Sequence, residues 1–206
     1  MITHKSANCN TLPDLEITVN SYKLMRIPEQ HYDCTISNIP DHCEYKERLK
    51  SWTARAEYNV IANKGILLFG QYSTGKSGAA AICLKAAATR RKIGLYLSAP
   101  MLVEYVFEKT MYNFNEGTTM INRARSVPLL VIDELIIDPG NPHYAKTLES
   151  LIRFRMDKKL CTIITTNHTT QELQEHCPSM SAALRQIVEP VEVSGHDFRK
   201  AFETKW

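Results

Sequence analysis

The stretch Gly65-Ile-Leu-Leu-Phe-Gly-Gln-Tyr-Ser-Thr-Gly-Lys-Ser77 decides the fold of this chain. Its apolar run, Ile66 to Phe69, predicts a short strand that is buried on both faces. The run stops at a glycine, and the spacing Gly70-x4-Gly75-Lys76-Ser77 is that of a phosphate-binding P-loop. An alanine-rich segment follows and favours a helix, so bound phosphates would lie at a helix N-terminus.

Each residue type in this loop has a chemical reason to be there. Glycines let the backbone curl tightly, so that its N–H groups point inward at phosphate oxygens. Lys76 brings a positive charge for the β- and γ-phosphates, and Ser77 offers a hydroxyl to Mg2+. A chance match in a turn is the alternative, and the flanking strand and helix disfavour it. We predict that ATP binds through Gly70, Ser73, Thr74, Gly75, Lys76, Ser77 and Gly78.

A second chemical landmark is the apolar strand Val127 to Ile132, which ends in two carboxylates, Asp133 and Glu134. Strands of a parallel sheet are this hydrophobic because both faces are covered, and ligands gather at their C-terminal ends. Asp133 would then hold Mg2+ beside the P-loop, and Glu134 would orient and deprotonate the attacking water. The alternative is a solvated strand end with no chemical role.

A third strand, Cys161 to Thr166, ends at Asn167. We expect Asn167 to lie between the P-loop strand and the Asp133 strand, within reach of the attacking water. An asparagine that merely starts a turn would be a fair interpretation if this strand stood alone.

Periodicity predicts the remaining elements. We expect a strand at Leu15 to Val19, an amphipathic helix over about 41–61 whose Lys/Arg face is solvated, and a strand over 92–98. Helices are expected after Pro100 and over about 145–156, with an irregular loop over 109–117 between them. Tyr112 and Phe114 in that loop could stack on single-stranded bases or cap a hydrophobic cluster, and spacing alone favours neither.

Composition limits the class of protein. The chain has 206 residues, 44% hydrophobic, which suits one globular domain, and its net charge of +3 only weakly indicates an acidic partner. Six scattered cysteines without a C-x2-C pair favour a reduced cytosolic compartment over a zinc site. The first residues lack an apolar signal core, and no apolar run approaches a membrane span. We therefore expect a cytoplasmic protein with no membrane partner.

The P-loop, the Ile-Asp-Glu pair and the Thr-Thr-Asn strand end together resemble the AAA+ ATPases, and more closely the DnaC/IstB-type helicase loader group. The likeness runs from about Ile27-Pro28 to the C-terminus and includes the helix before the P-loop, the stretch Leu151 to Arg155 and the ending Gly195 to Arg199. It implies an α/β P-loop AAA+ core, with a central parallel sheet flanked by helices and a minimal or absent lid domain. It also implies an AAA+ domain over 41–206 and a short N-terminal partner-binding or arm segment over 1–40.

Residue roles follow from the same resemblance. Gly70 to Ser77 match Walker A, Asp133 and Glu134 match Walker B, Asn167 matches sensor 1, and Arg199 matches the sensor 2 arginine that reads the γ-phosphate. These loaders also carry an arginine that reaches the neighbouring subunit's ATP. Here the matching stretch offers only Arg185, and ATP turnover should be weak if Arg185 cannot reach. Positions thought to touch single-stranded DNA correspond to Lys109, Tyr112, Phe114, His143 and Tyr144.

The resemblance implies a prokaryotic or phage-encoded ATPase that forms homo-oligomers around ATP and Mg2+. It would contact single-stranded DNA and deliver a replicative hexameric helicase ring. One alternative is an IstB-like transposition helper ATPase, which would coat duplex DNA and recruit a transposase. A P-loop kinase with no DNA role is the other alternative, and Glu134 beside Asp133 argues against it.

Overall fold

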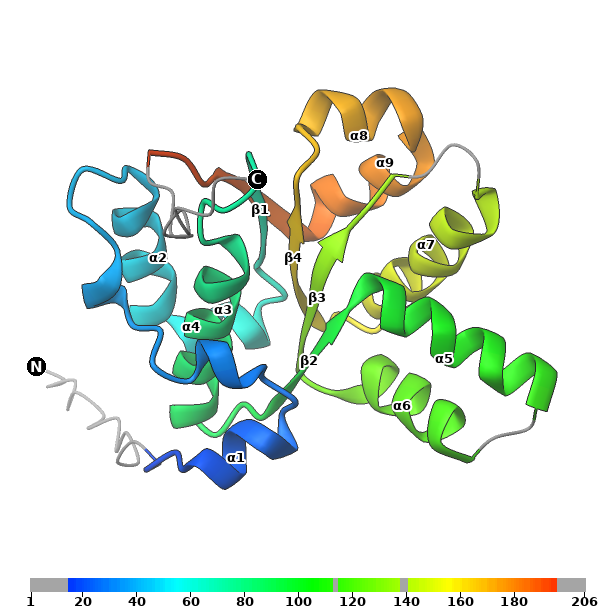
Figure 1. Ribbon diagram of the computed structural model, residues 1–206, viewed down its shortest axis with the longest axis horizontal. Helices are drawn as coiled ribbons and strands as arrows, with labels where there is room; N and C mark the ends of the chain where they lie inside the picture. The colour runs from blue at the N-terminus through cyan, green and yellow to red at the C-terminus, as the bar shows by residue number, and fades with distance from the viewer. Residues whose placement is uncertain (1–14, 113–114, 138–140, 196–206) are drawn as a thin grey trace, which may run out of the picture.

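The chain folds around one parallel sheet (Figure 1). The computed structural model describes residues 15–112, 115–137 and 141–195. The strands are β1 Gly65–Phe69, β2 Gly94–Ser98, β3 Leu129–Leu135, β4 Cys161–Thr166 and β5 Val188–Glu192, in the order β2-β3-β4-β1-β5. Every pairing in the sheet is parallel. This confirms the α/β class, and β4 lies between β1 and β3 as the sequence predicts.

Helices cover both faces of the sheet, because each parallel connection must cross over it. On one side lie α2 Tyr45–Ala54, α3 Ala56–Ile61 and α4 Lys76–Thr89 (Figure 1). On the other side lie α5 Ala99–Tyr112, α6 Asn115–Ser126, α7 Pro142–Asp157, α8 Thr170–His176 and α9 Pro178–Ile187. The short α1 Val19–Leu24 and the single-turn 3-10 helices Glu29–His31 and Ile36–Asn38 precede them. Among the described residues, no helix is both long and apolar enough to cross a bilayer.

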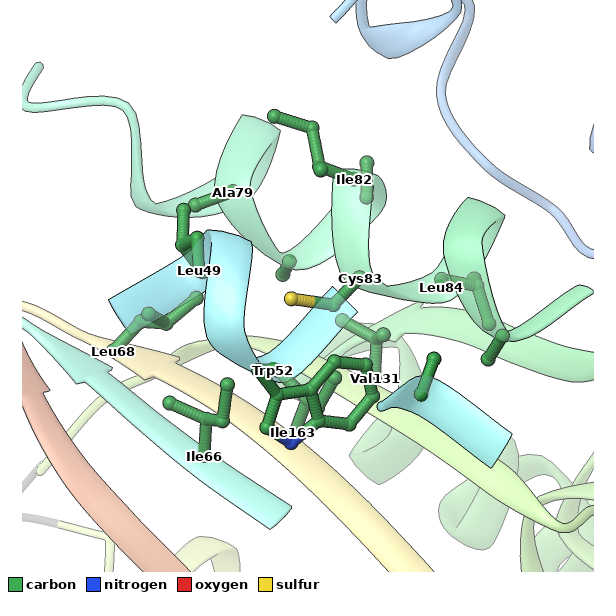
Figure 2. Close-up of a cluster of buried hydrophobic side chains, with 14 of the residues drawn as sticks. Leu49, Trp52, Ile66, Leu68, Ala79, Ile82, Cys83, Leu84, Val131 and Ile163 are labelled. Atoms are coloured by element: carbon green, nitrogen blue, oxygen red, sulfur yellow. The ribbon is translucent and has the colours of Figure 1, made fainter. Parts of the chain in front are cut away.

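Successive side chains of a strand point to opposite faces of the sheet, so the strands contribute to two hydrophobic cores, one on each face. In β1, Ile66 and Leu68 pack with α2, α3 and α4, whereas Leu67 packs with the opposite layer. Figure 2 shows the first core, where Leu49 and Trp52 meet Ile66, Leu68 and Cys83. Five buried alanines and Cys83 line α4, so this helix can lie close to the strands that present the P-loop.

Two local expectations are wrong. The predicted strand at Leu15 to Val19 does not form, because the Thr18 side chain accepts a hydrogen bond from the Ser21 N–H and starts α1. The predicted irregular loop over 109–117 is mostly helical, since α5 continues to Tyr112 and α6 starts at Asn115. Gly117 costs α6 only about 1 kcal/mol relative to alanine, and Met120 and Ile121 anchor that helix in the second core.

The predicted helix over 41–61 forms as two helices, α2 and α3, that meet at Arg55.

The residues before α2 pack against the sheet layer rather than extend from it. Met25, Ile27 and Ile39 are buried in the first core, and the Tyr96 N–H of β2 donates to the Met25 carbonyl at 2.8 Å. The Lys85 ammonium of α4 donates to the carbonyls of His31, Tyr32 and Cys34. One lysine therefore fastens the 31–34 turn to the helix that follows the P-loop.

Arg155 of α7 is fully buried at the end of the sheet where β3 and β4 begin, away from the P-loop. Its guanidinium donates to the carbonyls of Ala124, Val127 and Cys161 and to the Thr162 hydroxyl. No carboxylate of the described residues forms an ion pair with it. The guanidinium thus satisfies acceptors at the end of α6, in the connection to β3 and in β4, and so joins three elements.

Candidate nucleotide site

The P-loop closes between β1 and α4, and its backbone has the conformation that the glycines predict. Gly70 has φ +143°, and a Cβ at this position would lie 2.5 Å from the Val193 carbonyl oxygen. Gly75 has φ +92° and ends the loop just before α4 begins at Lys76. A side chain at Gly70 would therefore separate the P-loop from the chain that follows β5.

Lys76 is 7% exposed and lies against its own loop. Its ammonium donates to the Gly70 carbonyl oxygen at 2.9 Å and also to the Gln71 carbonyl oxygen. These contacts hold a positive charge over the hollow of the loop. Incoming phosphate oxygens would meet an ammonium that is already in place, at the N-terminus of α4.

The carboxylate strand end meets the P-loop through Asp133. Asp133 Oδ1 accepts hydrogen bonds from Ser77 Oγ at 2.9 Å and from Thr165 Oγ1. Thr165 Oγ1 in turn accepts from the Glu134 N–H at 2.9 Å. Glu134 has φ +58° and an exposed side chain, so the chain turns sharply there and the side chain is accessible at the cavity. Thr165 links the Asp133 carboxylate to the backbone N–H of Glu134, and sequence reasoning gave it no role.

A cavity of about 560 Å³ opens over these residues. Lys76, Asp133 and Asn167 all line it, as do Ser73, Thr74, Gly75, Ser77, Gly78 and Glu134. The strand order explains this convergence, because β1, β3 and β4 are neighbours and end at one edge of the sheet.

The opposite wall of the cavity comes from the segment before α2, which the sequence analysis had not placed in the site. It consists of Gln30, His31, Asp33, Cys34, Thr35, Asn38 and Ile39, with Tyr45 from α2. Burial lowers the pKa of His31 below its usual value, although the Asp133 carboxylate acts in the opposite direction. In the sequence, only the Ile27-Pro28 pair marks this segment, because the segment carries no spaced chemical motif.

The oxygen groups around Asp133 fit a magnesium ion. Mg2+ prefers oxygen ligands and is commonly held by one or two carboxylates together with phosphate oxygens and waters. Ser77 Oγ, Asp133 Oδ1 and Thr165 Oγ1 supply a hydroxyl-carboxylate group of this kind at the mouth of the P-loop. No group of three or more His, Cys, Asp or Glu side chains suited to a metal occurs in the described part of the chain. The fit therefore depends on the phosphate oxygens of a nucleotide as further ligands.

The other predicted site residues lie elsewhere. Arg185 is an exposed residue of α9 and does not line the nucleotide cavity of its own chain. His143 is exposed in the first turn of α7, whereas Tyr144 is half-buried and packs against the second core. Lys109 and Tyr112 belong to the C-terminal half of α5. Phe114 and Arg199 lie outside the described residues, so their predicted roles stay predictions.

Comparison with solved structures identifies the fold. The chain is similar to the DnaC helicase loader, with a TM-score of 0.72 and 16% identity over 81% of this chain and 100% of that chain. It is similar to DnaI, with a TM-score of 0.68 and 19% identity over 84% of this chain and 94% of that chain. It is also similar to a replication initiator DnaA bound to AMPPCP and single-stranded DNA, with a TM-score of 0.66 and 16% identity over 82% of this chain and 51% of that chain. No protein-family model and no curated protein matches the sequence.

The parallel sheet, with a P-loop and a carboxylate pair at its C-terminal edge, has the fold of these solved structures, which is the α/β fold expected of an AAA+ P-loop core. The match covers 100% of the DnaC chain and 94% of the DnaI chain. The resemblance of the sequence to this group is thereby confirmed at the level of the fold.

Proposed function

We propose that this chain is an ATPase that binds ATP with Mg2+ in the cavity between the P-loop and the 30–39 segment. The observation that carries the proposal is the joint position of Lys76, Asp133 and Asn167 on one cavity. Lys76 and the loop N–H groups bind the β- and γ-phosphates. Ser77 and Asp133 hold the magnesium, which neutralises charge on the phosphates when it is bound.

Hydrolysis would use the residues at the end of β3 and β4. The Glu134 carboxylate takes a proton from a water while the water oxygen bonds to the γ-phosphorus and ADP leaves. Asn167 donates its amide to that water or to the γ-phosphate and fixes its direction. The bond from the Glu134 N–H to Thr165 Oγ1 holds the backbone of the base in place. Arg199 would read the γ-phosphate, and Arg185 would act on the ATP of a neighbouring subunit.

For the biological role, we propose a DnaC-like replication factor. It would form a homo-oligomer with ATP, contact single-stranded DNA and deliver a replicative hexameric helicase ring. Support comes from the fold match, over 81% of this chain, to a structure that carries the name DnaC helicase loader, and from the P-loop site. We further propose that residues 1–40 include the helicase-binding segment and that Lys109, Tyr112, Phe114, His143 and Tyr144 contact DNA.

Nucleotide binding is tested with Lys76→Ala, measured by calorimetric titration with ATP. The variant should lose ATP binding, because its ammonium is the cation held at the P-loop. Lys92→Ala is the control, since Lys92 pairs with Glu57 and does not line the cavity. Unchanged ATP affinity in Lys76→Ala would contradict the assignment of the site.

The partner is tested by affinity capture from prokaryotic host lysate with ATP, using Glu134→Gln to retain the ATP-bound state. Recovery of a replicative helicase, absent from the Lys76→Ala control, is the expected result. Recovery of a transposase together with ATP-dependent filaments on duplex DNA would replace the loader with an IstB-like helper. Phosphorylation of a small acceptor without DNA binding would indicate a kinase.

A further inference from the structure

A second cavity, of about 480 Å³, lies away from the nucleotide cavity and shares no lining residue with it. Its walls come from α2, α3, the start of β1, the end of α9 and β5. It includes Gly65, at the N-terminal end of β1, whereas the P-loop follows the C-terminal end of the same strand. Five residues of strand separate the two ends by roughly 13–16 Å, so the two cavities of one chain are distinct sites.

The charge of this second cavity is strongly one-sided. Its charged lining residues are the basic Arg48, Arg55, Lys64 and Arg185 and a single acid, Glu189. Arg48 pairs with Glu189 at 2.8 Å, which leaves no acid in the lining for the other three. Within the described residues, Arg55 bonds to the neutral Ser51 hydroxyl, and Lys64 lies 5.0 Å from the centre of the Tyr58 ring. The cavity therefore attracts an anion.

The wall of this cavity also carries an exposed aromatic ring, which a simple anion does not need. Tyr58 lines the cavity and is 55% exposed, and the Lys64 ammonium lies over its ring. A ligand that fits would thus carry negative charge and a flat ring.

We propose that this cavity binds a single-stranded nucleic acid, with its phosphates on Arg55 and Lys64 and one base stacked on Tyr58. Single strands present phosphates beside unpaired bases. An acidic peptide would match the charge, but its carboxylates do not offer the ring. The site rests on none of the DNA-contact residues proposed above, and it extends the proposed function.

The test measures binding of a fluorescent oligocytidylate by anisotropy, without nucleotide, over a series of salt concentrations. Oligocytidylate supplies phosphates and a stacking ring. The double variant Arg55→Glu/Lys64→Glu should lose about tenfold or more in affinity, with a shallower salt dependence by roughly 0.7 per lost phosphate contact. The matched control Lys23→Glu/Lys158→Glu makes the same charge change at exposed residues outside this cavity and should bind as the parent chain does.

Stacking is tested separately at Tyr58. Tyr58→Ala should lose about fivefold or more in affinity, whereas Tyr58→Phe keeps the ring and should bind normally. Equal losses in both charge-reversal variants would overturn the site, as would no binding by the parent chain. Preference for polyaspartate over the oligonucleotide would assign the cavity to an acidic protein segment instead.

The outcome is separable from the ATPase proposal. Lys76→Ala should bind the oligonucleotide as well as the parent chain does, because the cavity lies away from the P-loop. Arg55→Glu/Lys64→Glu should in turn bind ATP normally. Failure of the ATP titration would leave the oligonucleotide result standing, and the reverse also holds.

Discussion

Ser77 and Asp133 lie 2.9 Å apart, from the hydroxyl oxygen to a carboxylate oxygen, and so join the first turn of α4 to the end of β3. The same carboxylate oxygen accepts from Thr165 of β4. A helix and two strands that are distant in sequence therefore meet at one oxygen atom. Any change in the spacing of α4, β3 and β4 would alter the oxygen ligands that we propose for magnesium.

Thr165 should be essential to the position of the Asp133 carboxylate and of the backbone at Glu134. Thr165→Val removes a donor from Asp133 and leaves the Glu134 N–H without its acceptor, which should reduce the free energy of unfolding by about 1–3 kcal/mol. ATP hydrolysis should fall further than ATP affinity, because the backbone of the proposed base loses its support. Urea unfolding and single-turnover hydrolysis measure the two effects. Thr165→Ser keeps the hydroxyl and should retain both properties, and a matching loss in Thr165→Ser would contradict this role.

Arg155 should be a major contributor to stability. Arg155→Met removes the guanidinium donor from three carbonyl oxygens, two of them in buried contacts, and the free energy of unfolding should fall by about 3 kcal/mol or more. Arg153→Met, two residues away on α7, is the control. Arg153 forms a partly exposed ion pair with Glu149 and exposed hydrogen bonds to Ser179, so its loss should cost about 1 kcal/mol or less. Equal losses in urea unfolding would mean that the buried network contributes little.

Arg185 should act on a neighbouring subunit, since it does not line the nucleotide cavity of its own chain. Arg185→Ala should reduce ATP turnover while ATP affinity stays unchanged. Glu134→Gln alone should reduce turnover by about 10²–10⁴-fold. A mixture of the two inactive variants should recover part of the activity, because one interface then combines an intact Glu134 with an intact Arg185. No recovery in a mixture that forms mixed oligomers would exclude this role.

His31 should make stability depend on pH. Burial lowers the pKa of His31 below 6.5 in the folded protein, so the unfolded chain binds the proton more readily. The contribution of His31 is then fully present above about pH 6.5 and decreases as the pH falls through that value towards the lower folded pKa. His31→Phe should flatten this part of the pH profile of urea unfolding. His176→Phe, at an exposed position of α8, is the matched control variant. An identical profile for His31→Phe and the parent chain would be the contrary result.

Much of the fold could be predicted because strands with two covered faces have a distinctive composition. Ile66 to Phe69 and Leu129 to Ile132 are uninterrupted apolar runs, and both are strands of the sheet. The errors fall where polar segments take their structure from distant contacts. The segment around Gly117 is helical because Met120 and Ile121 reach the second core, and no local signal in 109–117 shows that contact.

The residues of the nucleotide cavity also fall into those that the sequence predicts and those that it does not. Lys76, Asp133 and Asn167 could be brought together from sequence, since strand ends in a parallel sheet share one edge. His31, Thr35 and Asn38 could not, because their position depends on tertiary contacts between the segment before α2 and α4. The link from Thr165 to Asp133 depends on the register of β4 against β3, which the sequence pattern leaves undetermined.

The bond from Lys85 to the 31–34 turn has a mechanical consequence. Three carbonyl oxygens of that turn are held by one ammonium on the helix that begins at the P-loop. Tension applied to the chain before residue 31 would therefore act directly on a wall of the nucleotide cavity. The wall could move away from α4 only after its three bonds to Lys85 had broken, so the side chain of Lys85 is the anchor that resists such a pull.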